Sequence, residues 1–129
     1  MSNSQHRQPV RGYRDLIVFQ KAVSLVVASY AIAHCLPRDE RYELGRQLRR
    51  ASTSIPINIA EGAGRRTSRD NAQFLAIARG SLSEVEACCL IIQELKYAPP
   101  HRIAAALSIA DEVGRMLTTM IRQLARRTA

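Results

Sequence analysis

Apolar residues recur every three or four positions along most of this chain, and this spacing constrains the fold more than any other feature. It places the apolar side chains on one face of an α-helix. Three stripes show it: Leu44, Leu48, Ala51, Ile55 and Ile59; Phe74, Ala78, Leu82, Val85, Cys89, Ile92 and Leu95; and Ile103, Leu107, Ala110, Val113, Leu117, Met120 or Ile121, and Leu124. The stripes predict three helices, the last with a spacing close to a heptad seam.

A further segment, from about Asp15 to Cys35, is apolar on nearly all sides. Its β-branched residues would also suit a strand, but its length and the absence of a turn signal before Pro37 favour a helix. We expect Asp15 to be the N-cap and Pro37 to mark the end of this helix. A helix that is apolar on most faces must be buried on more than one side, which indicates subunit contacts as well as a core.

A proline is expected to interrupt the second helix, which begins near residues 37–40. Pro56 has no N–H to donate, so the carbonyl of Ser52 loses its partner within the helix. The hydroxyls of Ser52, Thr53 and Ser54 would stabilise the resulting kink through hydrogen bonds. The helix should end at its two glycines, Gly62 and Gly64.

The remaining boundaries complete an all-α chain. Ser68 is the expected N-cap of the third helix, which stops before Pro99, and Pro100 suits the first turn of the fourth. A chain of 129 residues favours one domain. We predict a disordered basic arm over residues 1–12 and, over residues 13–129, an antiparallel up-down four-helix bundle.

The chain is strongly basic, with 19 Lys and Arg against 11 Asp and Glu and a formal net charge of +8. All of the basic residues except Lys21 and Lys96 are Arg, which forms bidentate contacts with phosphate and carboxylate groups. The excess therefore suits an anionic partner or ion pairs between subunits. A GC-rich genome would produce the same excess, so composition leaves both explanations open.

One segment of the second helix, QLRRASTSIPINIAEG from Gln47 to Gly62, resembles the hallmark of the four helix bundle protein family. This family is also called the 23S rRNA intervening-sequence or S23 ribosomal-protein-like family. Further similarity lies in DLIVFQKA from Asp15 and in FLAIARGSLSE from Phe74, so that the resemblance covers roughly residues 13–97. The chain departs from the family pattern at Gly45-Arg46 and at Ala63, where an aromatic residue is common.

The resemblance implies a left-handed bundle that assembles as a ring-like homopentamer. It also implies kinship with the accessory protein of diversity-generating retroelements, a basic pentamer that binds nucleic acid and a reverse transcriptase. The family name refers to insertions in 23S rRNA genes, which is a genomic location and not an activity. No catalytic residues are established for the family, so none is carried over.

Two polar rows follow helical spacing: Arg50, Ser54, Asn58 and Glu61 on the second helix, and Arg79, Ser83 and Glu86 on the third. They predict either a polar pocket for an anion or a structural network in which Arg50 or Arg79 pairs with Glu61 or Glu84. We favour the network, which would specify packing. Gly62 and Gly80 are assigned to a helix end and a close helix approach. The network comprises Arg50, Asn58, Glu61, Arg79 and Glu84.

The other arginines form three clusters, on the second helix, at the entry to the third, and along the last helix. Repeated around a pentamer, they would bind phosphate backbones in a salt-dependent way without sequence specificity. The predicted nucleic-acid-binding residues are Arg46, Arg49, Arg65, Arg66, Arg69, Arg115, Arg122, Arg126 and Arg127.

Enzyme signatures are missing. The three His residues are isolated from one another, and Cys88-Cys89 lacks metal-ligand or redox spacing, so we expect no catalytic residue, metal or cofactor. Cys35, Cys88 and Cys89 are expected to be buried apolar residues. We expect no apolar run to be long enough to cross a bilayer, the longest being Ala22 to Ala33, and no signal peptide is recognised; both point to the cytoplasm and to no membrane contact.

Together with the resemblance, these observations predict a non-enzymatic homopentameric scaffold that binds RNA or DNA. A protein such as a reverse transcriptase is a further candidate partner. The alternative is a protein–protein assembly module whose arginines form ion pairs between subunits and which has no role with nucleic acid.

Overall fold

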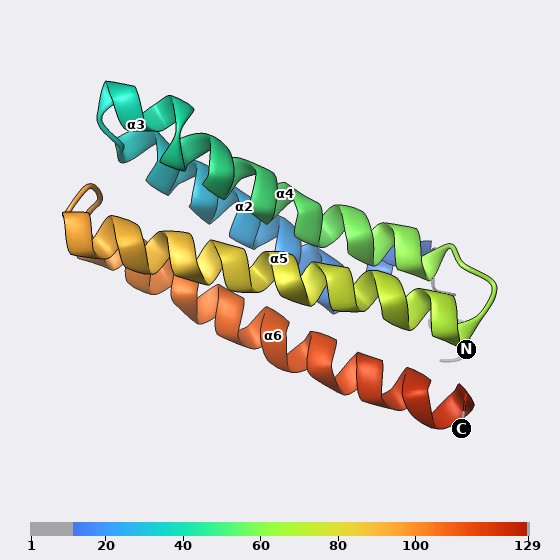
Figure 1. Ribbon diagram of the computed structural model, residues 1–129. Helices are drawn as coiled ribbons and strands as arrows, with labels where there is room; N and C mark the ends of the chain where they lie inside the picture. Colours follow the sequence, from blue (N-terminus) through green and yellow to red (C-terminus); the bar gives the residue numbers. More distant parts are fainter. Residues whose placement is uncertain (1–11, 129) are drawn as a thin grey trace, which may run out of the picture.

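The computed structural model describes residues 12–128, and this part of the chain is helical with no strand. A short 3-10 helix, η1 (Gly12–Asp15), precedes α2 (Ile17–Cys35), α3 (Arg38–Tyr42), α4 (Leu44–Ala63), α5 (Ser68–Leu95) and α6 (Pro100–Thr128). The four long helices α2, α4, α5 and α6 lie lengthwise beside one another (Figure 1). The predicted all-α four-helix fold is confirmed; residues 1–11 of the predicted arm lie outside the described residues.

Helix α2 packs one face into the bundle and leaves the opposite face exposed. Its buried positions follow helical spacing: Val18, Ala22, Leu25, Ser29, Ile32 and Ala33. On the other face Val23, Val27 and Tyr30 are 40%, 67% and 46% exposed. Within one protomer, therefore, α2 is buried on one face and not on several.

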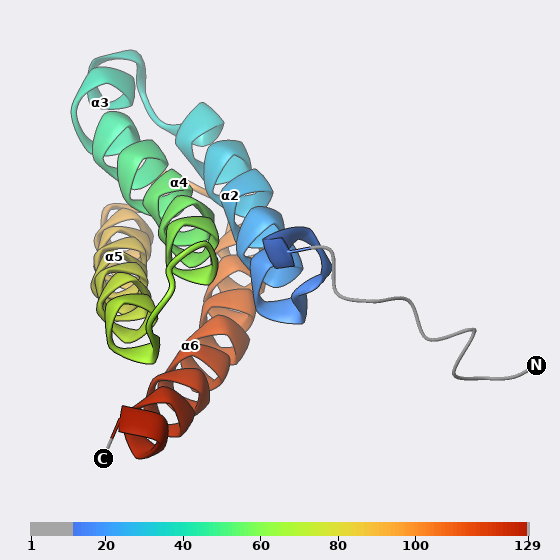
Figure 2. The same cartoon turned by 90° about the vertical axis from the view of Figure 1, so that its right-hand side faces the viewer.

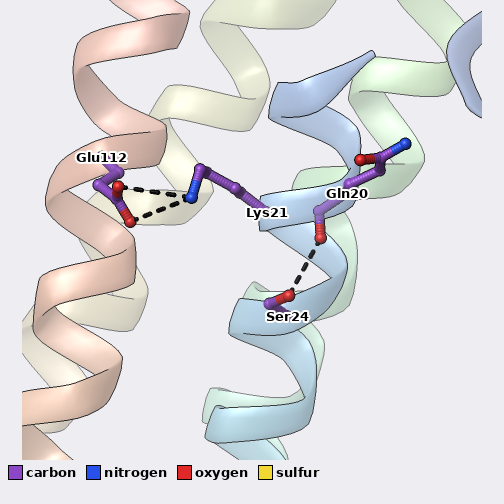
Figure 3. Close-up of polar contacts among 4 residues, drawn as sticks. All are labelled: Gln20, Lys21, Ser24 and Glu112. Carbon is purple, nitrogen blue, oxygen red and sulfur yellow. Dashed lines mark hydrogen bonds and ion pairs between the residues drawn. The ribbon is translucent and has the colours of Figure 1, made fainter. Parts of the chain in front are cut away.

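Two sequence-based expectations about α2 are wrong. Leu16, not Asp15, occupies the N-cap position, because Asp15 belongs to η1 and the N–H of Leu16 donates to the Tyr13 carbonyl at 3.0 Å. The exclusion of a membrane-spanning length also fails, since α2 is long and apolar enough to cross a bilayer by length and composition. In the fold it packs against α4 and α6, and one ion pair, from Lys21 Nζ to Glu112 at 3.4 Å, joins it to α6 (Figure 3).

The second helical region is divided at Glu43 and not at Pro56. Glu43 has φ −101° and ψ −85°, which separates α3 from α4, so the single helix expected from about residue 38 is wrong. The side chain of Arg41 fixes α3 to the end of α2: its Nε donates to the Leu36 carbonyl at 3.1 Å and its Nη2 to the His34 carbonyl at 3.2 Å.

Helix α4 is not broken at Pro56, contrary to the expected interruption. Side chains bond the surrounding backbone as predicted for the hydroxyls: Ser52 Oγ and Thr53 Oγ1 donate to the Arg49 carbonyl at 3.1 and 2.9 Å. Asn58 Nδ2 donates to the Ser54 carbonyl at 2.8 Å. These contacts reach carbonyl groups of the turns that precede the proline, and α4 continues past Pro56 to Ala63.

The cap of α5 differs by one residue from the expected one. Thr67, not Ser68, is the N-cap: its backbone is extended and its Oγ1 accepts from the N–H of Asp70 at 3.1 Å. Both residues are suited to capping, and the extended backbone at Thr67 decides between them. Helix α4 ends at Ala63 with Gly64 as its C-cap, close to the predicted end.

The core is formed by the predicted stripes, with small shifts. On α5, Ala78, Leu82, Val85, Cys89 and Ile92 are buried as expected. Leu95 is exposed and Phe74 only half-buried, whereas the neighbouring Leu75 is buried. The stripe on α6 is buried or half-buried throughout, and Ala106 joins it.

A close approach of two helices lies at Gly62, which was expected only to end a helix, and not at Gly80. A Cβ on Gly62 would lie 2.6 Å from Asn71 Oδ1 and 3.1 Å from both Asn71 O and Phe74 Cβ, so α4 and α5 meet there. A Cβ on Gly80 would meet nothing within 4 Å, and the predicted close approach at Gly80 is wrong.

Candidate functional site

The polar row on α4 contacts α5 through neutral side chains. Ser81 Oγ, on α5 and only 7% exposed, donates to Ser54 Oγ at 2.8 Å. Asn58 Nδ2 donates to the same Ser54 oxygen at 3.0 Å as well as to the Ser54 carbonyl. The three side chains thus form one hydrogen-bond network across the contact between α4 and α5, which we call the α4–α5 seam.

The predicted ion pairs of the network are not formed. Arg50 and Glu84 line a recess of about 190 Å³ beside Ser54 and Ser81 but make no ion pair with each other. Glu61 pairs instead with Arg65, which follows the C-cap Gly64 of α4, at 3.5 Å. The ion pair of Glu61 is therefore local, with a residue four positions further along the chain and not with an arginine of α5. Of the predicted network, Asn58 is the member that bridges to α5, through Ser54.

The polar row on α5 faces a different neighbour, α6. A groove of about 530 Å³ runs between these two helices, and we call it the α5–α6 groove. It gathers three arginines, three hydroxyl side chains and two acids within one surface depression. Its lining residues are Arg79, Leu82, Ser83 and Glu86 of α5 and Ala110, Asp111, Gly114, Arg115, Thr118, Thr119 and Arg122 of α6.

The arginines of the groove differ in their partners. Arg115 Nη2 lies 2.6 Å from Asp111 Oδ2, in an ion pair between exposed side chains one turn apart on α6. Arg79 and Arg122 are exposed and have no ion pair among the described residues. Arg79 was expected to pair with Glu61 or Glu84; it instead lies with Arg115 and Arg122, two predicted nucleic-acid-binding residues. The sequence shows the row of Arg79, Ser83 and Glu86. It does not show which helix this row faces.

The other predicted binding arginines divide into engaged and free side chains. Arg49 Nη2 donates to the Arg41 carbonyl at 3.2 Å, which holds that half-buried side chain within the protomer. The guanidinium of Arg65 lies 4.5 Å from the centroid of the Phe74 ring, in addition to its pair with Glu61. The exposed side chains without such contacts in the described structure are Arg46, Arg66, Arg69, Arg126 and Arg127.

Two of the three cysteines, Cys88 and Cys89, are buried thiols. Burial, with a smaller effect from Glu84, raises the pKa of Cys88 above its ordinary 9.0. Burial first, then Cys88 and Glu86, raises the pKa of Cys89 to about 11. The thiolate is the reactive form, so both side chains are unreactive near neutral pH. Cys35 is exposed, contrary to the expectation that all three are buried. Residues 12–128 include no cluster of three His, Cys, Asp or Glu side chains placed to hold a metal.

Comparison with known proteins agrees with the resemblance seen at the hallmark segment. Residues 14–119 match the model of the family described as 23S rRNA-intervening sequence protein. The chain belongs to this family. The match extends beyond the residues that carried the resemblance, through α5 and into α6, and so takes in most of the α5–α6 groove; Arg122 lies outside it.

A solved structure has the same fold as this member of the 23S rRNA-intervening sequence protein family. It is the crystal structure of a protein of unknown function from the S23 ribosomal protein family of Bacteroides thetaiotaomicron. The TM-score is 0.76 at 21% identity, over 81% of this chain and 98% of that one. No curated protein gives a significant match.

Proposed function

We propose that this chain is a non-enzymatic basic scaffold that binds the phosphate backbone of RNA or DNA without sequence specificity. The observation that carries the proposal is the exposure of its arginines on a chain of formal net charge +8: all nine predicted binding residues except Arg49 have exposed side chains. Exposed guanidinium groups attract phosphates and release their counterions, which gives binding that depends on salt and not on base sequence.

The scaffold is proposed to be a left-handed bundle that assembles as a ring-like homopentamer in the cytoplasm, away from membranes. The exposed apolar face of α2, with Val23, Val27 and Tyr30, supports contact with a neighbouring subunit, since such a face gains free energy when it is covered. Five copies would multiply the charge on one particle. By kinship with the accessory protein of diversity-generating retroelements, a reverse transcriptase is the proposed protein partner.

Two measurements test this function. Light scattering should give the mass of a pentamer, and a monomer or dimer would refute the assembly. Fluorescence polarisation with labelled RNA and DNA at about 50 and about 200 mM salt should show binding that weakens steeply as salt rises. Absence of salt-sensitive binding to either nucleic acid would refute the scaffold.

The α2 face also favours the second candidate, a protein–protein module with no nucleic-acid role. That module would leave polarisation unchanged at both salt concentrations while still assembling. Its arginines would form ion pairs between subunits. Because salt screens such pairs, the mass of the assembly would fall as the salt concentration is raised.

A further inference from the structure

We propose that the α5–α6 groove is the place where the backbone of a double-stranded nucleic acid lies, with Arg79 and Arg122 as the principal phosphate contacts. This inference rests on the proposed function and deepens it, because it assigns the contact to one groove and the ligand to duplexes. The groove brings together Arg79 in the middle of α5 and Arg122 in the body of α6, two residues 43 positions apart in the chain that converge only in the fold.

The two arginines are available to a ligand because no acidic side chain in the described part of the protomer pairs with them. Asp111 is engaged by Arg115 at 2.6 Å, and Glu86 is the other acid of the groove. Neither Arg79 nor Arg122 makes an ion pair in the described structure. A phosphate between two such guanidinium groups would receive charge-assisted hydrogen bonds from both helices.

Helix-end electrostatics do not explain these positions. Cations near a helix C-terminus are stabilised by the negative end of the helix dipole, an effect confined to the last turn. Arg126 and Arg127 lie in the last turn of α6, but Arg115 and Arg122 precede it, and Arg79 lies far from either end of α5. The helix dipole therefore does not account for Arg79 and Arg122, the two arginines of the groove without an ion pair in the described structure.

The absence of aromatic side chains from the groove selects duplexes over single strands. Proteins that bind single strands stack the unpaired bases on aromatic residues, and none of the eleven lining residues is aromatic. A duplex stacks its bases internally, so that phosphates and sugars line its outside and base edges are exposed only within its grooves. The hydroxyls of Ser83, Thr118 and Thr119 are side chains of the kind that contact those groups.

The test compares two double variants that remove the same charge. R79Q/R122Q changes the groove, and R38Q/R102Q changes two exposed arginines that lie outside the predicted binding set and also lack an ion pair in the described structure. Polarisation is measured with a short RNA duplex, the DNA duplex of the same sequence and the separate strands. The groove variant should lose about tenfold or more in duplex affinity. The slope of its log K against log salt should become less negative by about two, because two phosphate contacts are lost. The control should lose about twofold through its net charge alone.

Each outcome decides a separate point. Equal losses in the two variants would overturn the groove assignment and leave the scaffold intact, whereas a wild-type chain without salt-sensitive binding would overturn the scaffold itself. Tighter binding of single strands than of either duplex would overturn the duplex assignment. R79K/R122K keeps the charges and should retain the wild-type salt slope; far-ultraviolet circular dichroism of all variants should show unchanged helicity.

Discussion

The polar rows on α4 and α5 look alike in sequence, yet the two seams in which they lie are built differently. In the α4–α5 seam the polar groups bond one another: Ser81 reaches Ser54, and Asn58 completes the network. In the α5–α6 groove, Arg79 and Arg122 face solvent without ion pairs. Helix α5 lies between α4 and α6 in the view of Figure 1 and at one side of the bundle in Figure 2, and it packs against both, so one helix contributes to both arrangements. The contrast indicates that the first row serves packing and leaves the second available to a ligand.

The largest expected effect concerns the two buried thiols of α5, which lie between the seams. At pH 8, alkylation of Cys89 by iodoacetamide should be about a hundredfold slower than that of an ordinary thiol, since its pKa of about 11 lies two units above 9.0. Its rate should keep rising with pH up to about 11, whereas an ordinary thiol levels off above 9. Mass spectrometry of labelled peptides measures both, with the urea-unfolded chain as the control. If the alkylation rate of Cys89 in the folded protein levels off near pH 9, solvent reaches this thiol.

The next effect compares the glycines of the two seams. G62A forces a Cβ against Asn71 O and Phe74 Cβ at 3.1 Å and should cost about 1–3 kcal/mol in the free energy of unfolding. G114A meets only the end of the Leu82 side chain, at 3.1 Å, and no backbone atom, so its effect should stay within about 1 kcal/mol. Urea denaturation measures both.

G80A is the matched control for those two, because its Cβ enters open space. It should stabilise the chain by about 0.5–1 kcal/mol through helix propensity. Equal costs for G62A and G114A would show that the two seams are equally tight and would remove the structural basis of the comparison.

A smaller effect is expected at the serines. S81A removes the donor to Ser54 in a nearly buried position and should cost about 1 kcal/mol. S83A, two residues on, removes an exposed hydroxyl that bonds only the Arg79 carbonyl of its own helix, at 3.4 Å, and should change stability by less than about 0.5 kcal/mol. Thermal unfolding of S81A and S83A measures the stability that each variant loses. If S83A loses as much stability as S81A, the proposed division of roles between the two polar rows is contradicted.

The sequence predicts the helices well because apolar spacing is a local property. Leu48, Ile55 and Ile59 fall on one face whatever lies opposite, and the structure buries all three. The ends are less predictable: Thr67 and Ser68 are both good caps, and only the backbone at Thr67 decides between them. Residue type and helical position do not reveal such a choice.

The site is less predictable, because it depends on which helix each face meets. Gly80 and Gly62 are both helical glycines, but only Gly62 lies at a seam. Arg79 and Ser81 differ by two positions and therefore face different neighbours, α6 and α4. Spacing within one helix shows that residues share a face but not what lies across from it.

The smallest expected effect compares two exposed ion pairs, one beside each seam. E61Q and D111N each raise the net charge by one and each break a pair between residues four apart, Glu61 with Arg65 and Asp111 with Arg115. Both should cost only about 0.3–0.5 kcal/mol of stability. Their effects on nucleic-acid binding should differ. D111N frees a third guanidinium inside the α5–α6 groove and should tighten duplex binding several-fold at low salt. The slope of log K against log salt should become steeper by up to about one. E61Q frees Arg65 beside Phe74, outside the groove, and should give only the smaller gain expected from net charge. Polarisation with the same duplexes compares them directly, and equal tightening by the two variants would show that the chain binds through its overall charge and not through the groove.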